Sequence, residues 1–566
     1  MSTIQFLLLY AILPVVSVIV LYRPFLTFIT PKGIKGFPAL PNPKPIVGDL
    51  FAVVEGVERN GGIFLFIDEL AKQLGPNFQL RMLNQSALVR ILWLSDWSTA
   101  QLVAQDRSGN FDNAASGHPY FQQIIPKGML NLTGAKWKTH RRIMAPAMTG
   151  PYLRKSVAQM NDSLQALVSL WKLKADLAKG KPFGVLKDTE NSAMDITCGM
   201  AFGTSWKCNQ FAIDQIKASS GPATGELDEA VYQVNRPDIA ASFWYLVDCM
   251  GGQNRPFPLI RLSHFFTSFH PTYRAHRSTF DQELQRAIRN SRQRFQAAGA
   301  DLEAFNAQNT LDLMIGKTEL NNDNIPDDEI RDEIMTYLLA GTETTSATMG
   351  WGLKYLTIYP EIQVKLREVI HNAIPHLQSG EYSMDDVAPE NIPYLEALVY
   401  ETLRHARVAI GVARRTLRDT ILLGQHVPKD TTIFFPTYLG LEESPGWFGD
   451  RADEASRKVG FWKPGTSRAF TPERWLDSKG AFDPNSGPSL PFGSGIRGCF
   501  GKNFALLEMR IFFIQLSQAF FLAPVTEAQN SFASYETLTR HPKTALIRPI
   551  TWDSPEAQAA IARMAK

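Results

Sequence analysis

A cysteine in a glycine-rich segment is the residue of this chain best suited to chemistry. Cys499 follows three glycines and precedes a fourth in Pro491–Gly501 (PFGSGIRGCFG). Glycine has no Cβ atom, so such a backbone can turn tightly and approach a flat ligand closely. A thiolate near the guanidinium of Arg497 suits a metal that takes one soft, anionic ligand. A predicted helix from Lys502 would place its N-terminus beside the sulfur and favour the thiolate, whereas the alternative is a buried free cysteine in a turn.

A polar sequence inside a long apolar stretch indicates a second reactive group. Residues 340–345 read AGTETT. A threonine hydroxyl in a helix can bond the carbonyl four residues earlier, here Thr344 to Ala340, and loosen the local helix. Gly341 leaves space for a small ligand, and Glu343 supplies a carboxylate that, with Thr344, could relay protons into an apolar pocket. The alternative is a polar interruption that merely satisfies nearby carbonyl groups.

Trp137 and Arg141 offer donors for a carboxylate ligand. They lie four residues apart in a predicted helix, so one face carries an indole N–H and a guanidinium. The alternative is a core tryptophan beside a surface arginine.

The residues around Cys499 carry a family resemblance. Phe492, Gly495, Arg497, Cys499 and Gly501 match F-x-x-G-x-R-x-C-x-G, which resembles the haem-binding loop of the cytochrome P-450 monooxygenases. The resemblance implies that Cys499 is the axial thiolate ligand of haem b. It also implies that Phe492 contacts the haem and that Arg497 faces a haem propionate.

The same resemblance assigns roles to the other candidates. The sequence at 340–345 is similar to the family's oxygen-activation motif, which implies that Thr344 holds dioxygen and Glu343 delivers protons. Trp137 and Arg141 correspond to propionate contacts. Arg414 resembles a further propionate arginine on a strand, and we prefer it to Arg415 on spacing, although a slip of one residue reverses the face of a strand.

A resemblance also links three charged residues that fix the chain before the cysteine loop. Glu401 and Arg404 lie three residues apart in a helix predicted over 394–407, where they can pair. The family joins such a pair to the arginine of a Pro-Glu-Arg-aromatic segment, here Arg474. A solvated surface pair is the alternative for Glu401 and Arg404.

The elements that must position these groups are mostly helical. A helix is predicted from Asp327 to about Tyr359, since acidic residues occupy its first turn and Pro360 ends it. A β-hairpin is predicted over 78–83 and 87–94, and 441–467 is interpreted as a surface insertion. The expected fold is predominantly α with small β-sheets, a cytochrome P-450 fold preceded by an N-terminal transmembrane helix.

The N-terminal segment predicts a membrane anchor. Ile4–Tyr22 is 19 residues without a formal charge, which is long enough to cross a bilayer. Arg23 and Lys32 follow it, so the body of the protein is expected on the cytosolic side. A cleaved signal peptide is the alternative, but its basic start and small-residue cleavage site are poorly represented. We expect a single-pass anchor in the endoplasmic reticulum membrane (1–23), a basic, proline-rich hinge (24–48) and a haem-thiolate domain (49–566).

Composition narrows the class of function. A net charge of +3 over 566 residues gives no reason to expect nucleic acid as a partner, and four cysteines show no paired metal spacing. The resemblance implies a monooxygenase that inserts one oxygen atom from O2 into a lipophilic small molecule, with secondary metabolism as one setting. Electrons would come from NADPH through a separate cytochrome P-450 reductase. The alternatives are a haem-thiolate isomerase, dehydratase or peroxygenase that needs no reductase, and a non-enzymatic haem carrier or sensor.

Overall fold

The computed structural model describes residue 26 and residues 29–564, with gaps at 85–86, 96, 107–108, 115–118, 251–264, 302–304, 322, 324, 378–381, 410, 437–461 and 463–465. The predicted anchor at 4–22 lies outside these residues, as does nearly all of the predicted insertion. No helix among the described residues is long and apolar enough to span a membrane.

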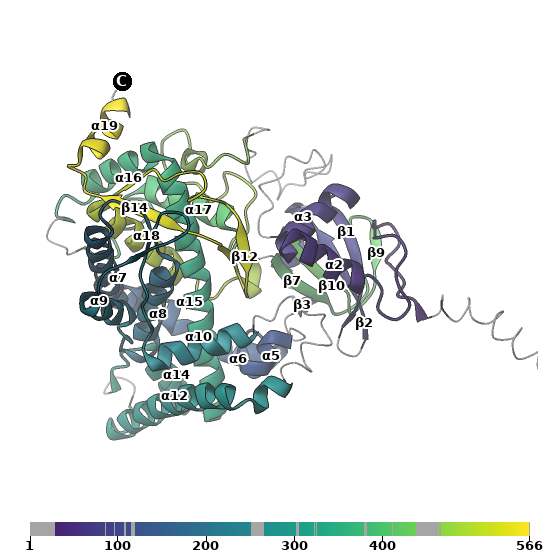
Figure 1. Ribbon diagram of the computed structural model, residues 1–566. Helices are drawn as coiled ribbons and strands as arrows, with labels where there is room; N and C mark the ends of the chain where they lie inside the picture. Colours follow the sequence, from purple (N-terminus) through teal and green to yellow (C-terminus); the bar gives the residue numbers. More distant parts are fainter. Residues whose placement is uncertain are drawn as a thin grey trace, which may run out of the picture.

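A five-stranded sheet forms one part of the molecule (Figure 1). Its order is β1-β2-β10-β7-β3, with the bounds β1 Asn77–Asn84, β2 Ala87–Leu94, β10 Thr432–Pro436, β7 Gly411–Thr416 and β3 Phe111–Asn113. The predicted hairpin is confirmed as β1 paired antiparallel with β2. Helices α2 (Leu50–Asn60) and α3 (Ile63–Leu74) belong to the same part, and Trp93 stacks between Phe78 and Phe434 beneath them.

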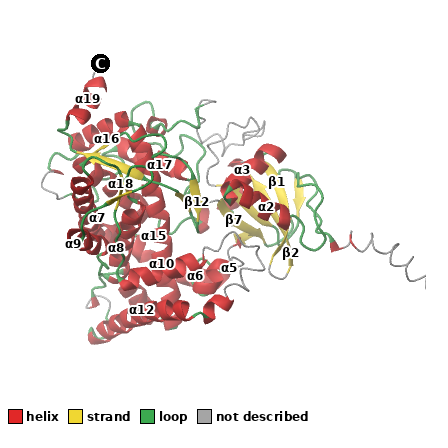
Figure 2. Ribbon diagram, in the orientation of Figure 1, coloured by secondary structure: helices red, strands yellow, loops and turns green. Residues whose placement is uncertain are grey.

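Helices make up most of the rest of the molecule (Figure 2). Their bounds are α4 Trp97–Gln105, α5 Pro119–Ile124, α6 Gly134–Met144, α7 Gly150–Ala178, α8 Leu186–Phe202, α9 Cys208–Ala218, α10 Asp238–Met250, α12 Pro271–Ala297, α14 Thr310–Leu320, α15 Asp327–Ile358, α16 Pro360–Ala373, α17 Pro393–Ala406, α18 Lys502–Ala519 and α19 Pro555–Met564. One large apolar core joins residues of these helices. The expectation of a predominantly helical fold is confirmed.

Small sheets complete the architecture. One has the order β11-β14-β4-β6-β5, and two more are the hairpins β12-β13 and β8-β9. Their bounds are β4 Phe183–Gly184, β5 Ala223–Thr224, β6 Ala230–Val231, β8 Thr420–Leu422, β9 Gln425–Val427, β11 Phe521–Ala523, β12 Ser534–Glu536, β13 Arg540–Pro542 and β14 Leu546–Ile550. In Figure 1 the strand β12 lies between the helical part and the five-stranded sheet.

Helix α15 passes through the helical part and is buried along most of its length. It begins at Asp327 as predicted and ends one residue before the expected end, at Ile358. Its 32 residues correspond to about 48 Å. A Cβ atom added to Gly341 would lie 2.9 Å from the side chain of Thr197 on α8. The glycine therefore lets two helices approach closely.

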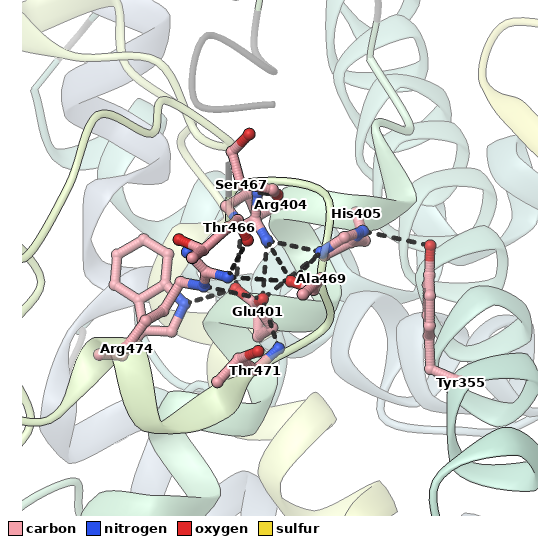
Figure 3. Close-up of polar contacts among 10 residues, drawn as sticks. Tyr355, Glu401, Arg404, His405, Thr466, Ser467, Ala469, Thr471 and Arg474 are labelled. Atoms are coloured by element: carbon pink, nitrogen blue, oxygen red, sulfur yellow. Dashed lines mark hydrogen bonds and ion pairs between the residues drawn. The ribbon is translucent and has the colours of Figure 1, made fainter. Parts of the chain in front are cut away.

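The predicted triad of Glu401, Arg404 and Arg474 is confirmed (Figure 3). Glu401 accepts hydrogen bonds from Arg404 Nε at 2.8 Å and from Arg474 Nε at 3.1 Å. Arg404 Nη1 also donates to the carbonyl of Ser467 at 2.6 Å. The side chains of Glu401 and Arg404 are fully buried, so they are not the solvated surface pair. This network fixes the segment 466–475, which precedes the cysteine loop, onto α17.

Candidate active site

The cysteine loop is folded by short backbone hydrogen bonds. Cys499 N donates to the carbonyl of Phe492 at 2.8 Å, and Gly498 N donates to that of Gly495 at 3.0 Å. Gly493 and Gly495 have φ angles of 63° and 71°, in the left-handed region that favours glycine. A Cβ atom on Gly495 would lie 1.9 Å from the carbonyl oxygen of Ala104. The loop therefore requires glycine both for its backbone conformation and for its contact with α4.

The sulfur of Cys499 faces a cavity rather than the protein core. Burial raises the pKa of its thiol, and this effect outweighs the Gly501 amide and the charges of Arg141 and Lys502, which lower it. The Gly501 amide at the helix N-terminus favours the thiolate, as expected from the sequence, but desolvation has the larger effect on the pKa. A stable thiolate at this position needs a further positive charge, and a coordinated iron ion would supply it.

The cavity in front of Cys499 has a volume of about 820 Å³. Side chains from both parts of the molecule line it, including Val53 and Phe64 beside the sheet and Ala340 and Thr344 on α15. Residues before and within β7, Ala409 and Gly411 to Ala413, line it, as do Asn113, Ala114 and Phe121. The aromatic side chains of Phe243 and Trp244 belong to the apolar core.

Two of the predicted anion-binding residues project from α6 into the same cavity. Trp137 and Arg141 both line it, and the guanidinium of Arg141 lies 4.5 Å from the centre of the Phe500 ring. Arg497 stacks on Trp137, with its guanidinium carbon 3.7 Å from the indole. Arg497 also forms an ion pair with Asp112, which the sequence did not indicate.

The strand β7 resolves the choice between Arg414 and Arg415. Arg414 lines the cavity and is 4% exposed, whereas Arg415 lies 4.0 Å from Asp430 in an exposed ion pair. Arg414 Nη1 donates to the carbonyl of Ala413 at 3.0 Å, and its buried Nη2 has no hydrogen-bond partner. Burial and the nearby charge of Arg497 lower the pKa of Arg414 to about 10.

The charges of these residues fit a dianionic cofactor. Arg141, Arg414 and Arg497 line one cavity, and the ion pair with Asp112 compensates one of the three charges. Burial, and to a smaller extent the charge of Arg141, lower the pKa of Arg497 despite its pairing with Asp112, so the remaining two positive charges are unfavourable without a counter-ion. The two propionates of a haem would balance them. With the thiol of Cys499 and the ring of Phe492 in the same lining, the residues fit a haem.

The two residues of the predicted oxygen-activation motif face different surroundings. Thr344 lines the cavity, and its hydroxyl donates to the carbonyl of Ala340 at 2.7 Å, as predicted. The carboxylate of Glu343 is instead bonded to Thr537 and to His541 Nε2, the latter at 3.1 Å. Glu343 is not among the residues that line the cavity. The two side chains therefore meet different parts of the protein, because neighbouring residues of a helix point in different directions.

Several residues of the cavity lie outside every motif found in the sequence. Glu333 of α15 lines it and accepts a hydrogen bond from His140 Nδ1 at 2.6 Å. Thr537 and Leu538, in the turn between β12 and β13, also line it. No local pattern marks these residues, since the folding of the chain brings them to the cavity.

Comparison with known proteins agrees with this geometry. The family model described as Cytochrome P450 matches residues 38–448 and 461–548. The cytochrome P450 monooxygenase GME11363 of Pestalotiopsis microspora is 28% identical, over 88% of this chain and 90% of the relative. For the cytochrome P450 monooxygenase TRI13 of Fusarium sporotrichioides the identity is 26%, over 91% and 95%. The Hps1-dma1 cluster cytochrome P450 monooxygenase cyp3.1 of Dothistroma septosporum is 32% identical over 39% of this chain and 78% of its own length. The chain thus belongs to the cytochrome P450 family and is a monooxygenase of that family.

Proposed function

We propose that this chain is a membrane-anchored monooxygenase that inserts one oxygen atom from O2 into a lipophilic small molecule of secondary metabolism. The observation that carries the proposal is the joint placement of Cys499, Arg414 and Thr344 around one cavity. A haem bound there supplies the chemistry of O2 activation, which a cysteine thiolate ligand promotes. One relative, cyp3.1, is named as a cytochrome P450 monooxygenase of the Hps1-dma1 cluster, and this name supports the assignment to secondary metabolism.

The residues of the chain have separate tasks in this activity. Cys499 would hold the iron, and Arg141, Arg414 and the indole of Trp137 would hold the propionates. Thr344 presents a hydroxyl oxygen to the cavity, because its hydrogen is donated to Ala340. This arrangement fixes the position of the cofactor from three different elements.

The wall of the cavity supports an apolar substrate. Most lining side chains away from the cysteine loop are aliphatic or aromatic, and they continue to α2 and α3 beside the sheet; examples are Val53, Val57, Ile63, Phe64 and Ile67. Apolar walls exclude water and favour substrates with a large hydrocarbon surface. We therefore propose that the substrate reaches from the haem toward α2 and α3.

We also propose that residues 1–23 anchor the chain in the endoplasmic reticulum membrane and that the catalytic domain lies in the cytosol. The side chain of Ile46, within the proposed hinge, is 53% exposed, and that of Phe51, just after the hinge, is 61% exposed. Exposed apolar side chains of this kind favour contact with a lipid surface.

Electrons are proposed to come from NADPH through a separate reductase. Lys136, Lys138, Arg142 and Lys502 are exposed and would form its docking face. Reversing their charges should slow reductase-driven turnover, and unchanged turnover would exclude this face.

The proposed function is tested with the full chain in lipid vesicles, supplied with haem and a reductase. Cys499→Ser should abolish the spectrum of a thiolate-bound haem and all product formation from a lipophilic substrate library. Cys249→Ser, at a partly exposed cysteine of α10, should change neither and serves as the matched control. Product formation by the wild type without NADPH or reductase would contradict the proposal, as would a thiolate spectrum retained by the serine variant at position 499.

A further inference from the structure

The β12–β13 hairpin contributes three side chains that bind the carboxylate of Glu343. Thr537 donates its hydroxyl hydrogen to Glu343 Oε1, and His541 Nε2 and Thr539 Oγ1 lie 3.1 and 3.3 Å from the same oxygen. Glu343 and His541 are each 2% exposed, so bulk water does not compete for these bonds. The acidic residue of the predicted motif is therefore held by groups 194 to 198 residues further along the chain.

Thr537 connects this cluster to the cavity. Its side chain lines the cavity and is bonded to Glu343. The hydroxyl hydrogen of Thr344 is donated to its own helix, so Thr344 can accept a proton or a hydrogen bond but does not bond Glu343. A proton that leaves Glu343 for the cavity can therefore pass through the Thr537 hydroxyl.

We propose that Thr537 relays protons from Glu343 into the cavity, and that His541 is the positioning residue that holds Glu343 toward Thr537. This inference rests on the proposed monooxygenase function, in which a substrate RH, O2, two electrons and two protons yield ROH and water. The electrons come from NADPH through the reductase, and the protons come from solvent. In the relay, Glu343 transfers a proton to Thr537 Oγ1 while Thr537 releases its own hydroxyl proton to the cavity, so the threonine is unchanged after each transfer.

Two carboxyl groups on neighbouring elements interact electrostatically with Glu343. Asp248 of α10 is exposed, and Glu190 of α8 is half-buried and paired with Arg236. Burial and the negative charge of Glu343 raise the pKa of Asp248 and that of Glu190, and the charge of Arg236 opposes both shifts. The charge of Glu343 is therefore felt by carboxyl groups on two other helices.

His541 acts on both the position and the charge of Glu343. Its imidazole is stacked on the ring of Tyr535, with centroids 5.2 Å apart and planes at 18°. Burial alone would raise the pKa of Glu343, but the hydrogen bond and charge of His541, with the hydroxyls of Thr537 and Thr539, hold it below the ordinary value of 4.5. Glu343 is therefore ionised at neutral pH and can accept protons from the solvent side.

The first test removes the Thr537 hydroxyl in the reductase-driven holoenzyme. Thr537→Val keeps the shape of the side chain, and we expect kcat to fall on the order of 10-fold with an increased solvent deuterium isotope effect. Haem content and the substrate-induced spectral shift should stay at wild-type levels. Thr537→Ser should restore kcat, and Thr420→Val, in the separate β8–β9 hairpin, controls for the loss of a threonine hydroxyl in a hairpin away from the cavity.

The second test separates the positioning role of His541 from a structural one. His541→Phe keeps a ring beside Tyr535 but removes the donor, whereas His541→Gln keeps an N–H donor. Infrared difference spectra between acidic and neutral pH, without turnover, should show the protonated carboxyl band of Glu343 at a higher pH in His541→Phe than in the wild type. The band is assigned by its loss in Glu343→Gln. In His541→Gln, the pH at which the Glu343 band appears should return toward the wild-type value, and most of kcat should be recovered.

The outcomes distinguish failure of the inference from failure of the proposed function. A wild-type protein without a thiolate-haem spectrum or oxygenated product overturns the proposed function itself. If the wild type is functional but Thr537→Val and Thr420→Val have the same kcat and the same solvent isotope effect, the relay is overturned. An unchanged Glu343 titration in His541→Phe overturns the positioning role.

Discussion

Replacing Glu401 by glutamine should destabilise the protein far more than the same change at an exposed site. Glu401 Oε2 accepts from Arg404 Nε at 2.8 Å and from Trp475 Nε1 at 2.9 Å, and Oε1 accepts from Arg404 Nη2 at 2.7 Å. A glutamine NH2 group at the Oε2 position would face two donors. At the Oε1 position it would also face the backbone N–H of Thr471 and the guanidinium of Arg474. Either orientation leaves the fully buried Arg404 without a counter-charge.

The expected size follows from the burial of this pair. Removing one partner of a buried ion pair costs about 3–5 kcal/mol. At the average entropy per residue, the unfolding entropy of a chain of 566 residues is about 1.2 kcal/mol/K, so Tm should fall by about 2.5–4 °C. The assay is thermal unfolding of the haem-loaded protein at a fixed heating rate. Glu473→Gln is the control, because Glu473 pairs with Lys365 at 2.7 Å and its side chain is 46% exposed, and it should change Tm by less than about 1 °C.

The pH dependence gives an independent check on the same reasoning. Although burial raises the pKa of Glu401, the hydrogen bonds and charge of Arg404 outweigh it and hold the pKa well below the ordinary value of 4.5. A depressed pKa in the folded state stabilises the protein at neutral pH, and this stabilisation is lost as the pH falls below about 4.5. The difference between wild type and Glu401→Gln should therefore shrink in acid. Equal Tm values for Glu401→Gln and Glu473→Gln at neutral pH would refute the argument.

Two further predictions concern the cofactor site. Arg414→Leu should weaken haem binding about 10- to 100-fold, which corresponds to the loss of one charge-assisted hydrogen bond. Arg415→Leu, on the opposite face of the strand, should leave haem affinity unchanged. The transfer of haem from each variant to apomyoglobin measures this affinity. Gly495→Ala should reduce the yield of haem-loaded protein, because its φ of 71° and the Ala104 carbonyl leave no room for a Cβ atom. Gly150→Ala is the control, because a Cβ atom at this first residue of α7 meets nothing within 4 Å; it should load normally, and equal loading of the two alanine variants would contradict this account.

The features predicted well from the sequence depend on local spacing. The long helix, the hairpin and the Glu401–Arg404 pair each follow from residues within a few positions of one another. The choice between Arg414 and Arg415 was harder, because strand alternation fixes opposite faces but does not say which face is inward. The pairing of β7 with β10, which sets Arg414 opposite Ile433, belongs to the tertiary fold.

The partners of charged groups were the least predictable part of the site. Arg497 lines the cavity, where a propionate was expected, but it also pairs with Asp112, 385 residues earlier in the chain. The Gly501 amide lowers the pKa of the Cys499 thiol as expected, but burial raises that pKa more strongly. Both outcomes depend on which atoms surround the group in three dimensions, and a sequence motif does not contain that information.

The acid–threonine motif shows most clearly why a correct motif can carry a wrong geometry. Its two residues are adjacent in α15, and adjacent side chains of an α-helix are about 100° apart. If one of them faces the cavity, the other must face a neighbouring element, here the β12–β13 hairpin. The hairpin meets Glu343 with hydroxyl and imidazole donors, so the carboxylate is ionised and held away from the Thr344 hydroxyl. Thr537 of this hairpin both bonds Glu343 and lines the cavity, which is the placement that the proposed proton relay requires.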